Sequence, residues 1–212
     1  WLGVILLNTG LGVLIYQNID TMGHAFLVAL IGLLCAACWW YCFRHRMPFS
    51  WGAVAPSTPY YDYVVLLGCF TFLIFEGYLQ YQYQIFGTRY GLAVSIPMVI
   101  FFFLAYLLDH RGVLGLAIVA LATWLGINVT PATLWQNNDF ESPTLIWTAV
   151  LLGATLALGG FLLGMQQRKR HFTNTYQQFS IHLCGISALC GLFVLDQPVV
   201  WAFILFGCLA FF

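Results

Sequence analysis

The residue best suited to chemistry is Glu76, which follows an apolar run without charge from Val64 to Phe75. An ionisable side chain inside a membrane segment costs at least about 2.5 kcal/mol, so it needs a partner or a function. In helical spacing, Glu76, Gln80 and Tyr83 share one face. The spacing predicts a polar stripe on a membrane helix, able to handle a proton, a cation or a small polar solute.

A second polar stripe lies near the C-terminal end of the chain. Its members recur at helical spacing and are His171, Thr175, Gln178 and His182. At 1.5 Å per residue, His182 lies on the order of 16 Å from the start of this stripe, and Glu76 lies about 18 Å beyond Val64. These similar depths would let Glu76 and His182 form a buried acid–base pair in a proton or cation relay. The alternative is a structural hydrogen-bond network in which both side chains are neutral.

Charged residues between two later helices form another candidate site. Asp109, His110 and Arg111 occupy a tight turn, and Arg168 and Arg170 are expected on the same side of the membrane. Together they could bind a lipid headgroup or phosphate, because one guanidinium group can donate two parallel hydrogen bonds to phosphate oxygens. The alternative is an ordinary solvated turn.

The cysteines raise the question of a metal site. The chain has seven, of which Cys35, Cys38 and Cys42 share a helical face one turn before His45. Thiolate ligands would place negative charge in lipid, and no second cysteine pair has zinc-ribbon spacing. We therefore interpret the cysteines as packing residues and expect neither a metal nor a cofactor.

Composition identifies the class of protein. Hydrophobic residues make up 62% of the chain and charged residues 7%, whereas soluble domains carry roughly 25% charged residues. The chain is therefore predicted to be a polytopic membrane protein, and its zero net charge argues against a nucleic-acid partner. Because it starts without Met and stops within an apolar run, we expect missing ends, including a soluble N-terminal extension.

A membrane-spanning helix needs about 20 apolar residues, and this rule predicts an all-α bundle. We treat residues 1–212 as a single transmembrane domain. The eight expected helices are 1–18, 24–43, 61–84, 90–108, 112–128, 143–165, 173–195 and 198–212.

Basic residues predict the orientation of this bundle. The clusters at 44–46 and 168–170 are separated by four crossings and so fall on one side, as the positive-inside rule requires. Both ends of the chain are then cytoplasmic, in a bacterial inner membrane. Arg89 falls on the outer side, where we expect an ion pair with Asp20.

Two helices carry small or helix-breaking residues. The expected helix 143–165 contains Gly153, Gly159, Gly160 and Gly164, which favour close packing within the monomer over a dimer interface. Pro97 lies inside the expected helix 90–108 and should kink it, because proline removes a helical hydrogen bond.

Several strings together resemble a known family. They are Leu11–Asp20, Glu76–Tyr83, Phe86–Gly91, Tyr106–Val113, Val129–Pro131 and His171–Tyr176. They are similar to those of a bacterial membrane-protein family catalogued as domain of unknown function 2157. The resemblance implies a membrane-helix fold and a soluble segment before the first helix, but it implies no activity and no functional residues.

Three functions stay open at this point. The first is transport of a proton, a cation or a small polar solute through the network around Glu76 and His182. The second is a non-catalytic subunit or scaffold with a protein partner or a second copy, surrounded by membrane lipids. The third, an enzyme acting on a lipid-linked substrate, ranks last because the chain has no nucleophile elbow, phosphate loop or metal-ligand spacing.

Overall fold

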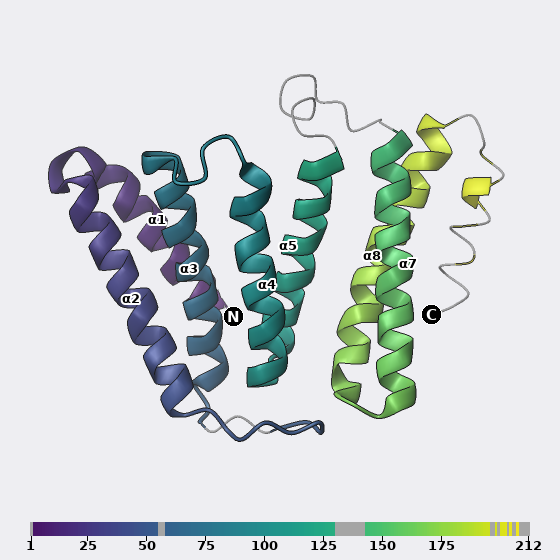
Figure 1. Ribbon diagram of the computed structural model, residues 1–212, viewed down its shortest axis with the longest axis horizontal. Helices are drawn as coiled ribbons and strands as arrows, with labels where there is room; N and C mark the ends of the chain where they lie inside the picture. The colour runs from purple at the N-terminus through teal and green to yellow at the C-terminus, as the bar shows by residue number, and fades with distance from the viewer. Residues whose placement is uncertain are drawn as a thin grey trace. The chain divides into compact units, whose positions relative to one another are not determined.

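The computed structural model describes residues 2–54, 58–129 and 143–195, with positions 198, 200–202, 204 and 207. Over the three longer ranges the chain forms seven helices and no strand, which confirms the predicted all-α class (Figure 1). The helices are α1 (Leu2–Met22), α2 (His24–Arg44), α3 (Tyr61–Tyr83), α4 (Tyr90–Leu108), α5 (Arg111–Val129), α7 (Pro143–Gln166) and α8 (Arg170–Val194).

Six candidate membrane spans lie within the described residues. By length and apolar composition they are His24–Arg44, Tyr61–Tyr83, Tyr90–Leu108, Arg111–Asn128, Pro143–Gln166 and Arg170–Val194. The predicted class, a polytopic membrane helix bundle, is therefore confirmed. The last expected helix, 198–212, falls mostly on residues that the structure does not describe.

Two helix boundaries differ from the sequence prediction. Helix α1 continues to Met22 and is separated from α2 by Gly23, whose φ of 76° favours glycine. Helix α8 begins at Arg170, directly after Lys169 in the left-handed region at φ 48°. The amide N–H of Phe172 donates to the carbonyl of Lys169 at 2.7 Å, so helical bonding starts within the basic residues. Hydropathy misses such turns because backbone bonding can continue into polar sequence.

The chain divides into two compact units, each described here by itself. The first comprises Trp1–Phe49 and Val54–Ala117, and the second comprises Ser50–Ala53 and Ile118–Phe212. The prediction that residues 1–212 form a single domain stays a prediction.

The first unit is held together mainly by packing between α2 and α3. A Cβ added at Gly68 would lie 3.3 Å from Cys38 Cβ, and one added at Gly32 would lie 3.1 Å from a ring carbon of Phe75. Small residues thus bring the two helices close, as expected where lipid supplies no hydrophobic drive between them. Leu27 and Ile31 form a buried cluster against the α3 side chains Ile74, Phe75 and Tyr78.

The second unit contains the α7–α8 hairpin (Figure 1). A Cβ at Gly153 would overlap Cys184 Sγ, and one at Gly160 would lie 3.0 Å from Tyr176 Cβ. The hydroxyl of Ser180 donates to the carbonyl of Gly153 at 2.7 Å across this contact. These glycines therefore pack within the monomer, as predicted, whereas Gly159 has nothing within 4 Å.

Candidate functional site

Glu76 lies in α3, one of the candidate membrane spans, and is buried to 8% exposure. Among the described residues, its Oε1 atom is buried without a hydrogen-bond partner. Burying a polar group without such a partner costs roughly 1–3 kcal/mol by mutational data, and an unpaired charge costs more. An acidic side chain is therefore buried among the helices with one carboxyl oxygen that makes no hydrogen bond to the described residues.

The neighbouring Gln80 belongs to the connection between α3 and α4. Its Nε2 donates to the carbonyl of Gly87 at 2.8 Å, and its Oε1 accepts from the amide of Phe86 at 3.0 Å. Gly87 adopts φ 56°, so the amide side chain closes a turn that requires glycine. Tyr83, at the end of the helix, is half exposed. Of the three residues predicted to line the α3 stripe, Glu76 is the buried one.

His24 and Tyr78 form a polar contact between α2 and α3. The Tyr78 hydroxyl lies 2.8 Å from His24 Nδ1, beside the cluster of Leu27 and Ile31. This contact joins α3 to the first residue of α2. Both residues lie at helix ends expected on the outer side, and that shared level predicts that the two ends face each other.

The polar stripe of α8 faces away from α7. Gln178 and His182 are exposed, whereas Phe172 and Tyr176, on the opposite face, are buried. His182 Nδ1 donates to the carbonyl of Gln178 at 2.6 Å, one turn earlier in the same helix. His171 and Thr175 are half-buried, and the ring of His171 makes an edge contact with that of Phe172, with centroids 4.5 Å apart. Because Glu76 belongs to the first unit and His182 to the second, their pairing stays a prediction.

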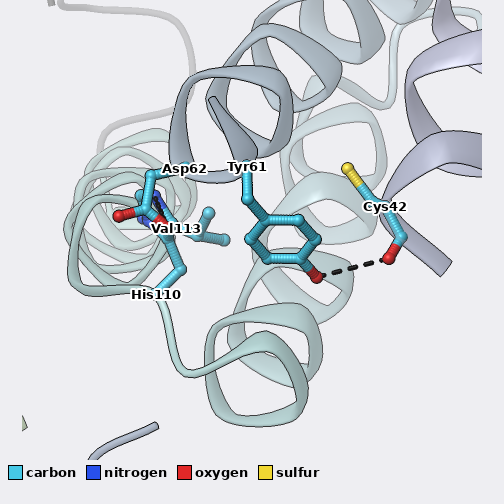
Figure 2. Close-up of polar contacts among 5 residues, drawn as sticks. All are labelled: Cys42, Tyr61, Asp62, His110 and Val113. Atoms are coloured by element: carbon cyan, nitrogen blue, oxygen red, sulfur yellow. Dashed lines mark hydrogen bonds and ion pairs between the residues drawn. The ribbon is translucent and has the colours of Figure 1, made fainter. Parts of the chain in front are cut away.

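A second buried polar site surrounds His110, between α4 and α5 (Figure 2). The amide of Val113 donates to His110 Nδ1 at 3.1 Å, so the proton of the neutral ring is on Nε2, which lies 3.9 Å from Asp62 Oδ1. Burial lowers the pKa of His110 below its ordinary value of 6.5, and the charges of Asp62 and Asp109 oppose this effect. The imidazole is therefore a hydrogen-bonded neutral group beside a half-exposed carboxylate.

Asp109 completes this end of the first unit. It lies at the end of α4 with φ 56°, and its Oδ2 accepts from the amide of Val54 at 2.7 Å. Nearby, the Tyr61 hydroxyl donates to the carbonyl of Cys42 at 3.3 Å, joining α3 to α2 (Figure 2). The predicted turn is confirmed, and one carboxylate oxygen of Asp109 accepts a hydrogen bond from the segment that leads into α3.

Asp62 is the acidic residue that the sequence analysis overlooked. It lies in the first turn of α3, 48 residues before His110. The signal was present, because two crossings return the chain to the same side, so the start of α3 and the α4–α5 turn had to share a level.

The basic residues of the predicted headgroup site lie in different units. Arg168 stacks over the ring of Trp51 at 4.8 Å, and the amide of Lys169 donates to the carbonyl of Trp51 at 2.7 Å. These contacts lie within the second unit, where Arg170 is exposed, whereas Arg111 is exposed in the first. A shared site for a headgroup stays a prediction. The expected pair of Asp20 and Arg89 falls outside the described side chains.

Cys35, Cys38 and Cys42 lie on the face of α2 that packs against α3, and all three are buried. Cys35 Sγ is 4.0 Å from the carbonyl of Gly68. Within the described ranges, no group of three His, Cys, Asp or Glu side chains is arranged to hold a metal ion. The contacts of these thiols are those of small packing residues in a close helix pair.

Comparison with known proteins gives one match. A family model described as "Predicted membrane protein (DUF2157)" matches residues 1–114. No curated protein and no solved structure matches the chain. The matched region ends three residues before the boundary of the first unit at Ala117 and includes Asp62, Glu76 and His110.

Proposed function

The chain belongs to the DUF2157 family of predicted membrane proteins, and from this premise we propose that it moves a small cation, the proton foremost, across the membrane through Glu76. Six long apolar helices make it an integral membrane protein. Ionisable residues within such helices commonly mark proton and ion pathways.

The burial of Glu76 with Oε1 unpartnered is the observation that carries this proposal. A purely structural role would favour a paired carboxyl group, because an unpaired one destabilises the folded protein. A group that must take up and release an ion needs instead an oxygen without a fixed donor, and Glu76 Oε1 has no partner among the described residues. In the proposed path, the α8 stripe from His171 to His182 supplies a further polar segment.

The expected orientation belongs to the same proposal. The positive-inside rule places the basic residues at the ends of α2 and α7 in the cytoplasm, for a bacterial inner membrane. Ions would then enter or leave the Glu76 region on the outer side through the end of α3 that carries Tyr83.

The test is ion flux through purified protein in phospholipid vesicles. A pH-sensitive dye inside the vesicles reports proton entry driven by an imposed potassium gradient with valinomycin. Glu76→Gln, which keeps the shape of the side chain and removes its titration, should reduce flux to the level of empty vesicles. Glu76→Asp should retain part of it.

Asp62→Asn is the matched control, because it removes another carboxylate from the same helix, at a half-exposed position. This variant should transport like the unmodified protein. Circular dichroism and size-exclusion chromatography check that all variants are folded. Normal flux in the Glu76→Gln vesicles would contradict the proposal and favour a non-catalytic subunit, which native mass spectrometry of the complex in its own membrane would identify by its partner.

A further inference from the structure

Helices α3 and α4 are antiparallel neighbours joined by residues 84–89 (Figure 1). Phe72 and Phe101 touch edge to face, with ring centroids 6.1 Å apart. Phe72 lies eleven residues before the end of α3, and Phe101 lies eleven residues after the start of α4. The ring contact and the helix ends therefore indicate the same alignment of α3 residues beside α4 residues.

This alignment places Glu76 level with Pro97. Glu76 is four residues beyond Phe72, and Pro97 is four residues before Phe101, so both lie one turn nearer the α3–α4 connection. Residues four apart share a helix face, so both also lie on the faces that bring the two phenylalanines together. Pro97 and Phe101 are buried in α4, as Glu76 is in α3.

Pro97 leaves a backbone acceptor at the same level. Proline has no N–H, so the carbonyl of Ala93, four residues earlier in α4, lacks its usual helical donor. Membrane helices tolerate such prolines where a neighbouring helix satisfies the freed carbonyl. Glu76 is the side chain of α3 that lies at this level with unused hydrogen-bonding capacity.

The Glu76 carboxyl can bond the Ala93 carbonyl only when the carboxyl is protonated. An ionised carboxylate is only an acceptor and would face another acceptor, the Ala93 carbonyl. A protonated carboxyl has one O–H to donate, which matches the one missing donor. Charged groups at this level are few, because α4 carries no Asp, Glu, Lys, Arg or His, and His24 of α2 is bonded to Tyr78. The side chain of Asp20 in α1 is outside those described.

We infer that the cation bound at Glu76 is a proton, and that the protonated carboxyl donates its hydrogen bond to the Ala93 carbonyl, which Pro97 leaves without a donor in α4. The inference rests on the proposed function, since it names the ion for the same residue. Release of the proton breaks the bond between α3 and α4 and leaves two acceptors facing each other. Proton loading is thereby coupled to contact between these helices at the level of Pro97.

Infrared spectroscopy of the reconstituted protein at neutral pH tests the inference. A protonated carboxylic acid has a C=O stretch separate from the amide bands, and a hydrogen-bonded acid absorbs at lower wavenumber than a free one. We expect a hydrogen-bonded acid band that shifts in D₂O and disappears in Glu76→Gln. Pro97→Ala and Pro97→Gly both return an N–H to the Ala93 carbonyl, so the band should move to the position of a free acid.

Met98→Ala, next to Pro97, is the control and should leave the band in place. Absence of any band that depends on Glu76, or a free-acid band in the unmodified protein, would overturn the inference without using a proline variant. An unchanged band in both Pro97 variants would also overturn it. Flux through the unmodified protein and through Glu76→Gln is measured separately. If transport depends on Glu76 but the carboxyl is ionised, the proposed function stands, and only the protonated state and its bond to Ala93 are refuted.

Discussion

Glu76 and His110 are both buried titratable side chains of the first unit, at 8% and 6% exposure, but their surroundings differ. His110 accepts a backbone N–H at Nδ1 and faces Asp62 with Nε2, so both ring nitrogens have a neighbour of suitable chemistry. Glu76 has a buried oxygen without a partner in the described part of the chain. Burial alone therefore does not distinguish these two sites, whereas hydrogen-bond satisfaction does.

The comparison predicts that the α4–α5 turn contributes to stability, and Asp109 offers the largest effect. Asp109→Ala removes the acceptor for the Val54 amide and places alanine at φ 56°. We expect the free energy of unfolding to fall by about 1–3 kcal/mol from the unsatisfied amide, with backbone strain in addition. Equilibrium unfolding in mixed micelles with SDS measures this change.

Two further substitutions at position 109 separate these causes. Asp109→Asn keeps an oxygen acceptor and tolerates the left-handed region, so its stability should be close to that of the unmodified protein. Asp109→Gly relieves the strain and loses only the hydrogen bonds, so it should lie between Asn and Ala. Equal stability of all four proteins would show that the turn is an ordinary surface loop, and the contrast with Glu76 would fail.

At Glu76 the same comparison predicts a smaller change of opposite sign. Glu76→Met replaces an unsatisfied buried carboxyl by an apolar side chain of similar length. Made in the Pro97→Ala background, where the Ala93 carbonyl has its own helical donor, the change should raise the free energy of unfolding by about 1 kcal/mol, since an orphan polar group is removed and no hydrogen bond is lost. The same unfolding assay measures the effect, with flux expected to be absent.

A stabilised but inactive Glu76→Met protein would show that the carboxyl is kept for function at a cost in stability. Its counterpart at the other site is Asp62→Leu, which should not be stabilising because Asp62 is half exposed and faces His110. A clear loss of stability on Glu76→Met in the Pro97→Ala background would instead identify Glu76 as a satisfied structural group, in conflict with the proposed function.

The sequence predicts most of the fold, because twenty-residue apolar runs leave little choice in a membrane. The ends of α2, α3, α4 and α7 were predicted to within about one residue, a better agreement than boundaries usually allow. The uncharged run from Val64 to Phe75 also identified Glu76, since the carboxylate that follows it stands out. The glycine contacts of Gly153 and Gly160 followed from their spacing.

The partners of each polar side chain were harder to predict. Helical spacing placed Gln80 on the Glu76 stripe but could not show that its amide binds Phe86 and Gly87 across the connection. Likewise, Asp62 and His110 are 48 residues apart, and only the crossing pattern relates them. Spacing along one helix predicts which residues share a face. A hydrogen bond also depends on a second segment, and tertiary packing sets the position of that segment.

The smallest predicted effect is the response of the His110 site to acid. Burial lowers the pKa of His110 from 6.5 in the folded protein, so the unfolded chain binds its proton at a higher pH than the folded chain does. Stability is therefore fully present above pH 6.5 and falls as the pH drops toward the folded pKa. Thermal unfolding in detergent between pH 7.5 and pH 5, with His110→Asn as reference, isolates this contribution, because Asn keeps an acceptor for the Val113 amide.

Asp62→Asn sharpens this prediction further. The charge of Asp62 opposes the lowering of the His110 pKa, so its removal should lower that pKa again and enlarge the loss of stability in acid. The order of acid sensitivity should be Asp62→Asn, then the unmodified protein, then His110→Asn. Stabilisation by acid in the unmodified protein would mean that His110 and Asp62 form a true ion pair. His110 would then be a charged group with its partner, and the contrast with Glu76, whose Oε1 has no partner among the described residues, would become stronger.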